Sequence, residues 1–150
     1  MSKKIEYSIP LKLDIGCRDI KREGFTGLDI LDFGQGIVWN VLEGIPVQDN
    51  SVTEIICYHL LEHITWSQLR SVIFEMYRVC KNGAKIHIRT PHKDGNSAYK
   101  LTHVTFWDEK IISGIEASCK NSTICNFKII KNERVGDELH AMLEVIKIEK

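Results

Sequence analysis

Apolar residues in this chain fall into short runs bounded by turn residues, a pattern typical of β-strands. Such runs predict strands at 11–15, 25–30, 36–39, 52–58 and 84–90. Only nine residues separate the first two runs, too few for the crossover helix of an ordinary parallel βαβ unit. Two longer β runs, 127–135 and 138–149, flank Gly136-Asp137, and this dipeptide predicts a hairpin.

Two segments show helical spacing instead. In the first, apolar residues recur every three or four positions and form one stripe, at Trp66, Leu69, Val72, Ile73, Met76 and Val79. Thr65 and Gln68 have the spacing of a capping box, and Gly83 is expected to stop this helix. The second predicted helix, 107–119, has an apolar face at Ile111, Ile112, Ile115 and Cys119. Strands that alternate with helices and end in a hairpin predict an α/β fold, mainly parallel with an antiparallel edge.

Length and composition narrow the class of protein. The 150 residues, 43% of them hydrophobic, suit one packed core, so we expect one domain over residues 1–150. Basic and acidic residues number 20 each, and zero net charge gives no overall attraction to nucleic acid or to an anionic membrane. No signal-length apolar segment lies in 1–9, and no apolar run is long enough to span a membrane.

Five cysteines, an odd number without a C-x-x-C pair, disfavour both a disulfide framework and a zinc knuckle. A reducing compartment is the natural setting for such a chain. The sequence therefore predicts a soluble, cytoplasmic protein.

The residues that follow the predicted strands carry the candidate chemistry, because ligands of parallel sheets bind at the carboxyl ends of the strands. Gly16 follows the first strand, where the missing Cβ lets a ligand approach the backbone. Asp29 ends the second strand, where a carboxylate accepts hydrogen bonds from both hydroxyls of a ribose. Each residue alone is also explained by an ordinary turn, and their pairing in one short segment favours the binding site.

At these residues the chain resembles the class I methyltransferases that use S-adenosylmethionine (SAM), and especially a small subgroup with a shortened first helix. The resemblance covers residues 11–112 in order: LDIGC, EGFTGLDI, GIPVQDNSVTEII, YHLLEHI, YRVCKNGAKIHIRTPH and THVTFWDEKII. It implies a three-layer Rossmann-like methyltransferase fold in minimal form. The implied cofactor contacts are Asp14, Gly16 and Cys17 around the methionine part, Asp29 on the ribose, Asn40 near the adenine and His59 beside the methyl group.

Two positions depart from the pattern of this family. Arg18 stands where a second glycine is usual, and its charge either repels the sulfonium or pairs with the methionine carboxylate. Asn40 stands where an aspartate is common, and its carbonyl oxygen still accepts a hydrogen bond from the adenine amino group.

Histidines supply the other candidate chemistry. His92 and His103 are implied to line the acceptor side, where either is a candidate general base, and a backbone-bonded loop histidine is the alternative for each. The segment from His59 to His63 also reads H-x-x-E-H, a zinc-protease signature with both histidines on one helical face. Against a zinc hydrolase, the motif directly follows a strand and no third ligand is marked.

These observations predict methyl transfer from SAM to an unidentified acceptor by in-line displacement, with S-adenosylhomocysteine as product. The acceptor site is expected to be open, so that a macromolecular acceptor, a partner subunit or a second copy of the chain completes it. A methyltransferase fold without activity, acting as a binding or scaffold protein, is the alternative.

Overall fold

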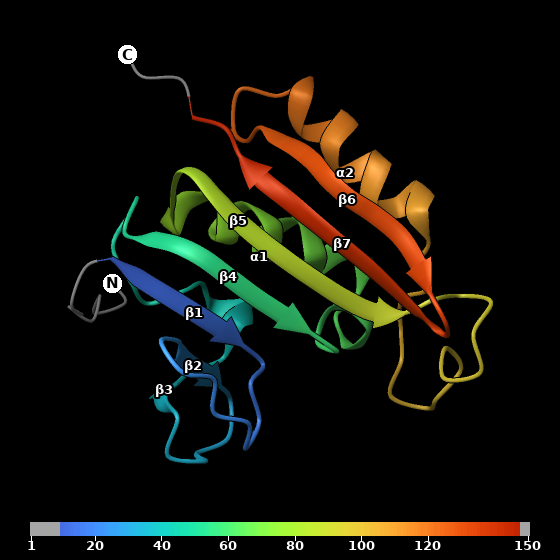
Figure 1. Ribbon diagram of the computed structural model, residues 1–150, viewed down its shortest axis with the longest axis horizontal. Coiled ribbons are helices and arrows are strands. Elements are labelled where there is room, and N and C mark those ends of the chain that lie inside the picture. Colours follow the sequence, from blue (N-terminus) through green and yellow to red (C-terminus); the bar gives the residue numbers. More distant parts are fainter. Residues whose placement is uncertain (1–9, 148–150) are drawn as a thin grey trace.

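A seven-stranded sheet organises the structure, a computed structural model that describes residues 10–147 (Figure 1). The strands lie in the order β3-β2-β1-β4-β5-β7-β6. All neighbouring pairs are parallel except those made by β7, which runs antiparallel to both β5 and β6. The strand bounds are β1 Leu11–Ile15, β2 Thr26–Asp29, β3 Gly36–Val38, β4 Val52–Tyr58, β5 Cys80–Pro91, β6 Phe127–Val135 and β7 Glu138–Val145. The predicted mainly parallel sheet with a C-terminal antiparallel hairpin is confirmed.

Two α-helices and two short 3₁₀ turns accompany the sheet: α1 Trp66–Val79, α2 Glu109–Lys120, η1 Val41–Glu43 and η2 Leu61–His63. The stripe predicted for α1 is buried at Leu69, Val72, Ile73, Met76 and Val79, whereas Trp66 is 48% exposed. Asp108 caps α2, because its side chain accepts a hydrogen bond from the Ile111 N–H. The second helix therefore begins two residues later than predicted.

Two expectations about the ends of α1 were wrong. Thr65 is the N-cap residue, but its hydroxyl donates to the Gln68 side chain at 2.9 Å and makes no bond to the helix backbone. At the other end α1 runs directly into β5 at Cys80, so Gly83, with φ +81°, lies inside that strand.

Both helices lie on one face of the sheet, and Figure 1 looks onto the other face. The connections from β1 to β2 and from β2 to β3 contain no helix. Within the described residues the protein therefore has two layers, a sheet and one layer of helices, where three had been expected. The core fills the space between these layers, with Leu13, Ile55 and Ile86 from the sheet and Met76 from α1 all at most 1% exposed.

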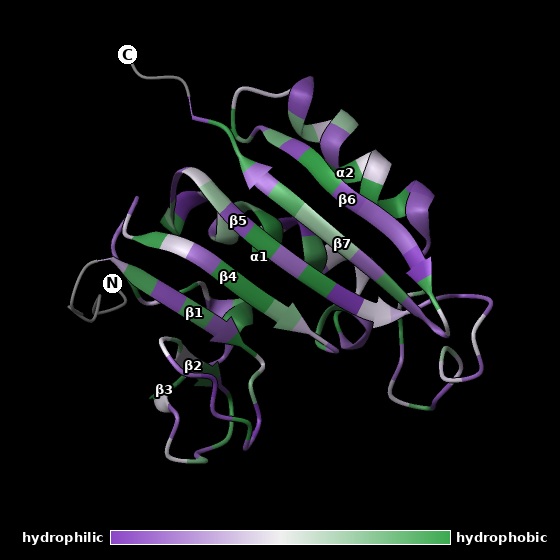
Figure 2. Cartoon of the chain, viewed as in Figure 1, coloured by the Kyte–Doolittle hydropathy of each residue, from purple (hydrophilic) through white to green (hydrophobic). Residues whose placement is uncertain are grey.

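The uncovered face of the sheet is built from charged and polar side chains, which appear as hydrophilic bands in Figure 2. One row crosses five strands in register with alternating sign, through Lys12, Glu54, Lys85, Glu144 and Lys128. Lys12 lies 3.4 Å from Glu54, and Lys85 lies 2.6 Å from Glu144. Opposite charges on neighbouring strands stabilise a sheet that faces water. This face therefore needs no second layer of helices.

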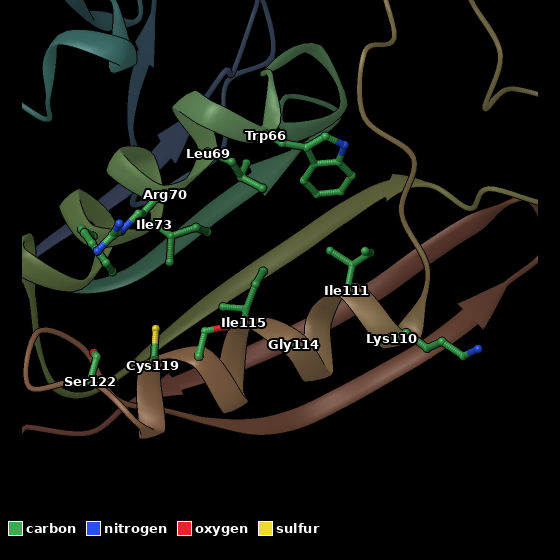
Figure 3. Close-up of a pocket in the computed structure, with 12 residues that line it drawn as sticks. Trp66, Leu69, Arg70, Ile73, Lys110, Ile111, Gly114, Ile115, Cys119 and Ser122 are labelled. Carbon is green, nitrogen blue, oxygen red and sulfur yellow. The ribbon is translucent and has the colours of Figure 1, made fainter.

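An apolar groove of about 540 Å³ separates α1 from α2 on the covered face. Figure 3 shows Trp66, Leu69 and Ile73 of α1 across this groove from Ile111 and Ile115 of α2. Among residues 10–147, no helix is long and apolar enough to cross a membrane.

A disulfide joins Cys119, in the last turn of α2, to Cys125, just before β6. The expectation from cysteine number and spacing was wrong here, since an odd total does not prevent one local pair. The other three cysteines, Cys17, Cys57 and Cys80, are free and buried. The absence of a signal segment in 1–9 concerns residues outside the described part of the chain.

Shortening the apolar stripe of α1 is expected to destabilise the fold. Leu69→Ala should lower the free energy of unfolding by about 2–5 kcal/mol, because it removes a side chain that is 6% exposed and leaves a cavity. The exposed Ser71→Ala, on the same helix, should change it by less than about 0.5 kcal/mol. Urea unfolding of both variants measures this, and equal effects would mean that the packing of α1 is misassigned.

The disulfide predicts a specific thiol count. Protein unfolded in denaturant without reductant should show three reactive thiols, and five after reduction. Five thiols before reduction, in protein purified without reductant, would show that Cys119 and Cys125 remain unpaired.

Candidate functional site

The candidate site lies at the carboxyl ends of β1, β2 and β4. The strand order reverses direction at β1, whose two neighbours are β2 on one side and β4 on the other. Loops that leave neighbouring strands at such a point diverge and open a crevice, where ligands of parallel sheets bind. Gly16, Asp29 and His59 each follow or end one of these three strands. The topology therefore brings the main predicted cofactor residues to one edge of the sheet.

The loop after β1 is tied directly to β2. The N–H groups of Gly16 and Cys17 donate to the Leu28 carbonyl oxygen at 2.8 and 3.4 Å. A Cβ on Gly27 would lie 2.7 Å from the Cys17 sulfur, so only glycine at position 27 lets the loop pack this closely. These bonds connect β1 to β2 where no crossover helix is present, and they occupy the N–H groups of Gly16 and Cys17.

Gly16 adopts a backbone conformation that favours glycine. Its φ is +73°, and an added Cβ would lie 3.1 Å from the Leu60 side chain. Both constraints favour glycine. Cys17 beside it is 3% exposed, and burial raises the pKa of its thiol to about 11, so Cys17 is a packing residue and not a nucleophile.

Asp29 holds the loops after β1 and β2 together. One carboxylate oxygen accepts the Arg18 N–H at 2.9 Å, and the other accepts the Leu31 N–H at 3.1 Å. The side chain is half-buried at the edge of the sheet. A carboxylate has about four acceptor positions, so each oxygen keeps one of them for a ligand.

Arg18 adopts φ +55°, a left-handed conformation that costs a residue with a side chain about 1–2 kcal/mol. This conformation explains why glycine suits the position. The Asp29 carboxylate stabilises it by accepting the Arg18 N–H, while the exposed Arg18 side chain remains at the rim of the site.

Asp14, predicted beside the methionine part of the cofactor, is 3% exposed and paired with Arg22 at 2.9 Å. Burial raises the pKa of this carboxyl, and the Arg22 charge opposes the rise. The Tyr58 ring lies against the guanidinium groups of Arg22 and Arg89, at 5.1 and 4.4 Å from the ring centre. A cavity of about 460 Å³ adjoins Asp14 and Arg22. No motif in the sequence marks Arg22, because only the bend of the loop brings it to Asp14.

Asn40 is the N-cap residue of η1, and its side-chain oxygen accepts the Leu42 N–H at 3.0 Å. The oxygen keeps one lone pair, and the amide nitrogen keeps its donors for a ligand. The neighbouring Trp39 indole N–H is buried without a hydrogen-bond partner. Asn40 therefore has a structural role in addition to its predicted place near the adenine.

His59 lies in a left-handed conformation, φ +56°, at the end of β4. Its Nε2 is 2.7 Å from a Glu138 carboxylate oxygen at the start of β7. The helical arrangement assumed for the H-x-x-E-H motif does not form, because a single 3₁₀ turn over Leu61–His63 follows the strand. His59 and His63 therefore do not share one helical face, and the zinc-protease arrangement is not present.

The two candidate bases differ in their surroundings. His92 is 4% exposed, its Nδ1 accepts the Asp94 N–H at 3.1 Å, and its Nε2 lies 3.2 Å from the Glu109 carboxylate. Both nitrogens of His92 are therefore engaged, which disfavours the predicted role as general base. His103 bonds the Ala98 carbonyl oxygen through Nδ1 at 3.1 Å. Because a carbonyl only accepts, His103 Nδ1 carries the proton and Nε2 has a free lone pair.

Comparisons with known proteins agree with this architecture. A family model described as a methyltransferase domain matches residues 21–88. The fold resembles that of the 16S rRNA (adenine(1408)-N(1))-methyltransferase from Catenulisporales acidiphilia, with a TM-score of 0.66 and 10% identity over 94% of this chain and 87% of that one. No curated protein sequence matches the chain.

This chain has the class I methyltransferase fold. The resemblance drawn from the sequence motifs is thereby confirmed. Another similar structure is the Burkholderia thailandensis 1,6-didemethyltoxoflavin-N1-methyltransferase, with a TM-score of 0.69 and 12% identity over 93% of this chain and 72% of that one. A third is the Haloferax volcanii complex between the Trm112 methyltransferase activator and a protein assigned as a methyltransferase, with a TM-score of 0.70 and 10% identity over 94% and 84%.

The left-handed backbone at Arg18 in this methyltransferase fold is testable with a pair of variants. Arg18→Gly should be more stable than Arg18→Ala by roughly 0.5–1 kcal/mol, because glycine relieves the strain at φ +55° and both variants remove the same charge. Thermal and urea unfolding of the two variants measures the difference. A more stable Arg18→Ala would show that residue 18 does not occupy this conformation.

Proposed function

We propose that this chain is a SAM-dependent methyltransferase. The proposal rests on the hydrogen-bond acceptor positions that the Asp29 carboxylate keeps, at the point where the strand order of the sheet reverses. Each of its two carboxylate oxygens accepts one backbone N–H and keeps one further hydrogen-bond acceptor position. Asp29 ends β2, beside the glycine loop that follows β1. Two remaining acceptors match the two hydroxyls of a ribose. The resemblance to methyltransferases, and the S-adenosylhomocysteine bound in the Burkholderia structure, support SAM as the nucleoside.

The rest of the cofactor is assigned from the loops around Asp29. We assign the adenine to the side of Asn40, whose amide keeps both donors and one acceptor position. The methionine part is assigned to the loop at Gly16 and Cys17, next to Asp14. Because the N–H groups of residues 16 to 18 are bonded to β2, we assign the methionine carboxylate to the exposed Arg18 guanidinium.

The protein mainly has to align the reactants and exclude water. SAM supplies a methyl group on a sulfonium that is already activated for in-line displacement. His59 follows β4, and its contact with Glu138 orients the ring. We assign the methyl group of SAM to the side of His59. Holding donor and acceptor in this orientation lowers the entropic part of the barrier.

The acceptor side is formed by the segment between β5 and α2, where several apolar side chains are exposed. Tyr99 is 72% exposed, and its ring stacks on that of Phe106 with the ring centres 5.1 Å apart. We propose that an acceptor or a partner subunit covers this segment, and the Haloferax complex with an activator supports a partner. The cytoplasmic location expected from the sequence stays a prediction.

Removing the Asp29 carboxylate is expected to weaken SAM binding. Asp29→Ala should lower the affinity by roughly 10- to 100-fold, equivalent to about 1.5–3 kcal/mol for a charge-assisted hydrogen bond. Calorimetric titration with SAM and S-adenosylhomocysteine measures the change. The unfolding temperature of Asp29→Ala should be measured alongside the titration, because the same carboxylate also accepts the Arg18 and Leu31 N–H groups.

Asp32→Ala is the matched control, since this aspartate lies in the next loop and its carboxylate accepts only the Gly34 N–H among the contacts described. It should bind SAM as tightly as the wild type. Equal affinity in the wild type and in Asp29→Ala would remove Asp29 from the site. Absence of binding in the wild type would favour the scaffold alternative over an enzyme.

A further inference from the structure

Three side chains with metal-binding chemistry meet beside the proposed methyl-transfer site. Glu62 and His63 belong to η2, and His103 lies in the segment between β5 and α2. One ligand atom from each residue lies within 4.8 Å of the other two. The two imidazole rings make an edge-to-face pair with centres 4.9 Å apart. A stretch of 39 residues thus separates His63 from His103 in sequence but not in space.

The hydrogen bonds of both histidines leave the same nitrogen free. His63 Nδ1 contacts the Thr102 carbonyl oxygen at 2.9 Å, and His103 Nδ1 contacts the Ala98 carbonyl oxygen at 3.1 Å. A carbonyl only accepts, so each Nδ1 carries the proton and each Nε2 presents a lone pair. Metal-binding histidines are oriented in this way, with the other ring N–H donated to a backbone carbonyl or a carboxylate.

Glu62 supplies the negative charge, and its side chain is unusually placed for a carboxylate. The side chain is 3% exposed, and its Oε2 is buried without a hydrogen-bond partner. Its Oε1 lies 3.8 Å from His63 Nε2, a separation too long for a hydrogen bond. A buried carboxylate oxygen without a partner costs free energy that a bound cation would recover.

The backbone around these side chains is held firmly in place. The N–H groups of Val104 and Thr105 donate to the Glu62 carbonyl oxygen at 2.8 and 3.2 Å. The buried Thr105 hydroxyl donates to the Leu61 carbonyl oxygen and accepts the Trp107 indole N–H. These bonds hold the segment that carries His103 against η2, so the three side chains are positioned before an ion binds.

We propose that Glu62, His63 and His103 form a binding site for a divalent transition-metal ion, with Zn²⁺ as the probe. Two histidines and one carboxylate form a ligand set that zinc and non-haem iron use in proteins. Ligand atoms of a tetrahedral zinc ion are about 3.4 Å apart for bonds of about 2.1 Å. Separations of at most 4.8 Å therefore close by about 1.4 Å or less, within the reach of side-chain rotation.

The position of the site leaves it accessible to solvent and next to the proposed methyl position. The His63 side chain is 39% exposed, which gives an ion a path from solvent, and three protein ligands leave coordination positions for water. His59 Nδ1 lies 3.8 Å from Glu62 Oε1, so the site adjoins the proposed methyl position. Gly16 and Asp29 lie outside this ligand set, so SAM binding can be measured on the metal-free protein.

Metal titration of the 150-residue chain tests the proposal. Protein stripped with a chelator and then dialysed should bind one equivalent of Zn²⁺ by calorimetry and should unfold at a higher temperature with the ion present. Co²⁺ should give visible d–d absorption typical of nitrogen and oxygen ligands, without thiolate charge transfer. His63→Ala and His103→Ala should each weaken Zn²⁺ binding at least about 100-fold, since loss of an outer-shell partner alone costs 10- to 100-fold.

Two further variants make the result specific. Glu62→Gln keeps the size of the side chain, and should lose the zinc-dependent rise in unfolding temperature while staying folded without metal. His87→Ala removes a histidine from the charged face, where His87 pairs with Glu54, and should bind Zn²⁺ within about threefold of the wild type.

Absence of stoichiometric Zn²⁺ and Co²⁺ binding by the folded wild type would overturn the proposal. So would equal binding by the wild type, His63→Ala and His103→Ala, because the ion would then be held elsewhere. SAM titration of the metal-free wild type tests the proposed function separately, since that site uses other residues.

Discussion

The structure depends on a sheet that, within residues 10–147, is covered by helices on only one face (Figure 1). In β5 and β7, apolar side chains alternate with polar ones, so that every second residue points to the helices. The other face carries the alternating charges from Lys12 to Lys128, which are neutralised between strands. Parallel strands usually require cover on both faces. Here the cross-strand ion pairs allow the second helical layer to be absent from the described part of the chain.

This constraint determines how the candidate cofactor site is built. Without a crossover helix after β1, the glycine loop has no helix N-terminus to present to an anion, and its N–H groups are bonded to β2. Asp29 consequently serves the fold and the proposed ligand together, because its carboxylate joins two loops and keeps acceptor positions. The strained backbone at Arg18 is tolerated in the same place, as strained residues are at many binding sites.

On the side of β4, the candidate site is held together by side-chain and backbone hydrogen bonds between loops. There the chain concentrates hydrogen bonds between η2 and the segment before α2, around the buried Thr105 and Trp107. The same bonds bring Glu62 next to two histidines that are 40 residues apart in sequence, His63 and His103. The hydrogen bonds that hold this segment in place therefore also keep the Glu62 carboxylate buried, with one oxygen unpaired.

The sequence by itself determined the elements, the sheet type and the strand ends that carry Gly16 and Asp29, because apolar periodicity and turn residues act locally. It predicted β1, β4 and β6 with their observed bounds. Only the tertiary structure decided the partners of these residues: that Arg22 reaches Asp14, that His92 is closed by Glu109, and that Cys119 meets Cys125. Such contacts depend on how loops fold back over the sheet, and spacing along the chain does not encode that path.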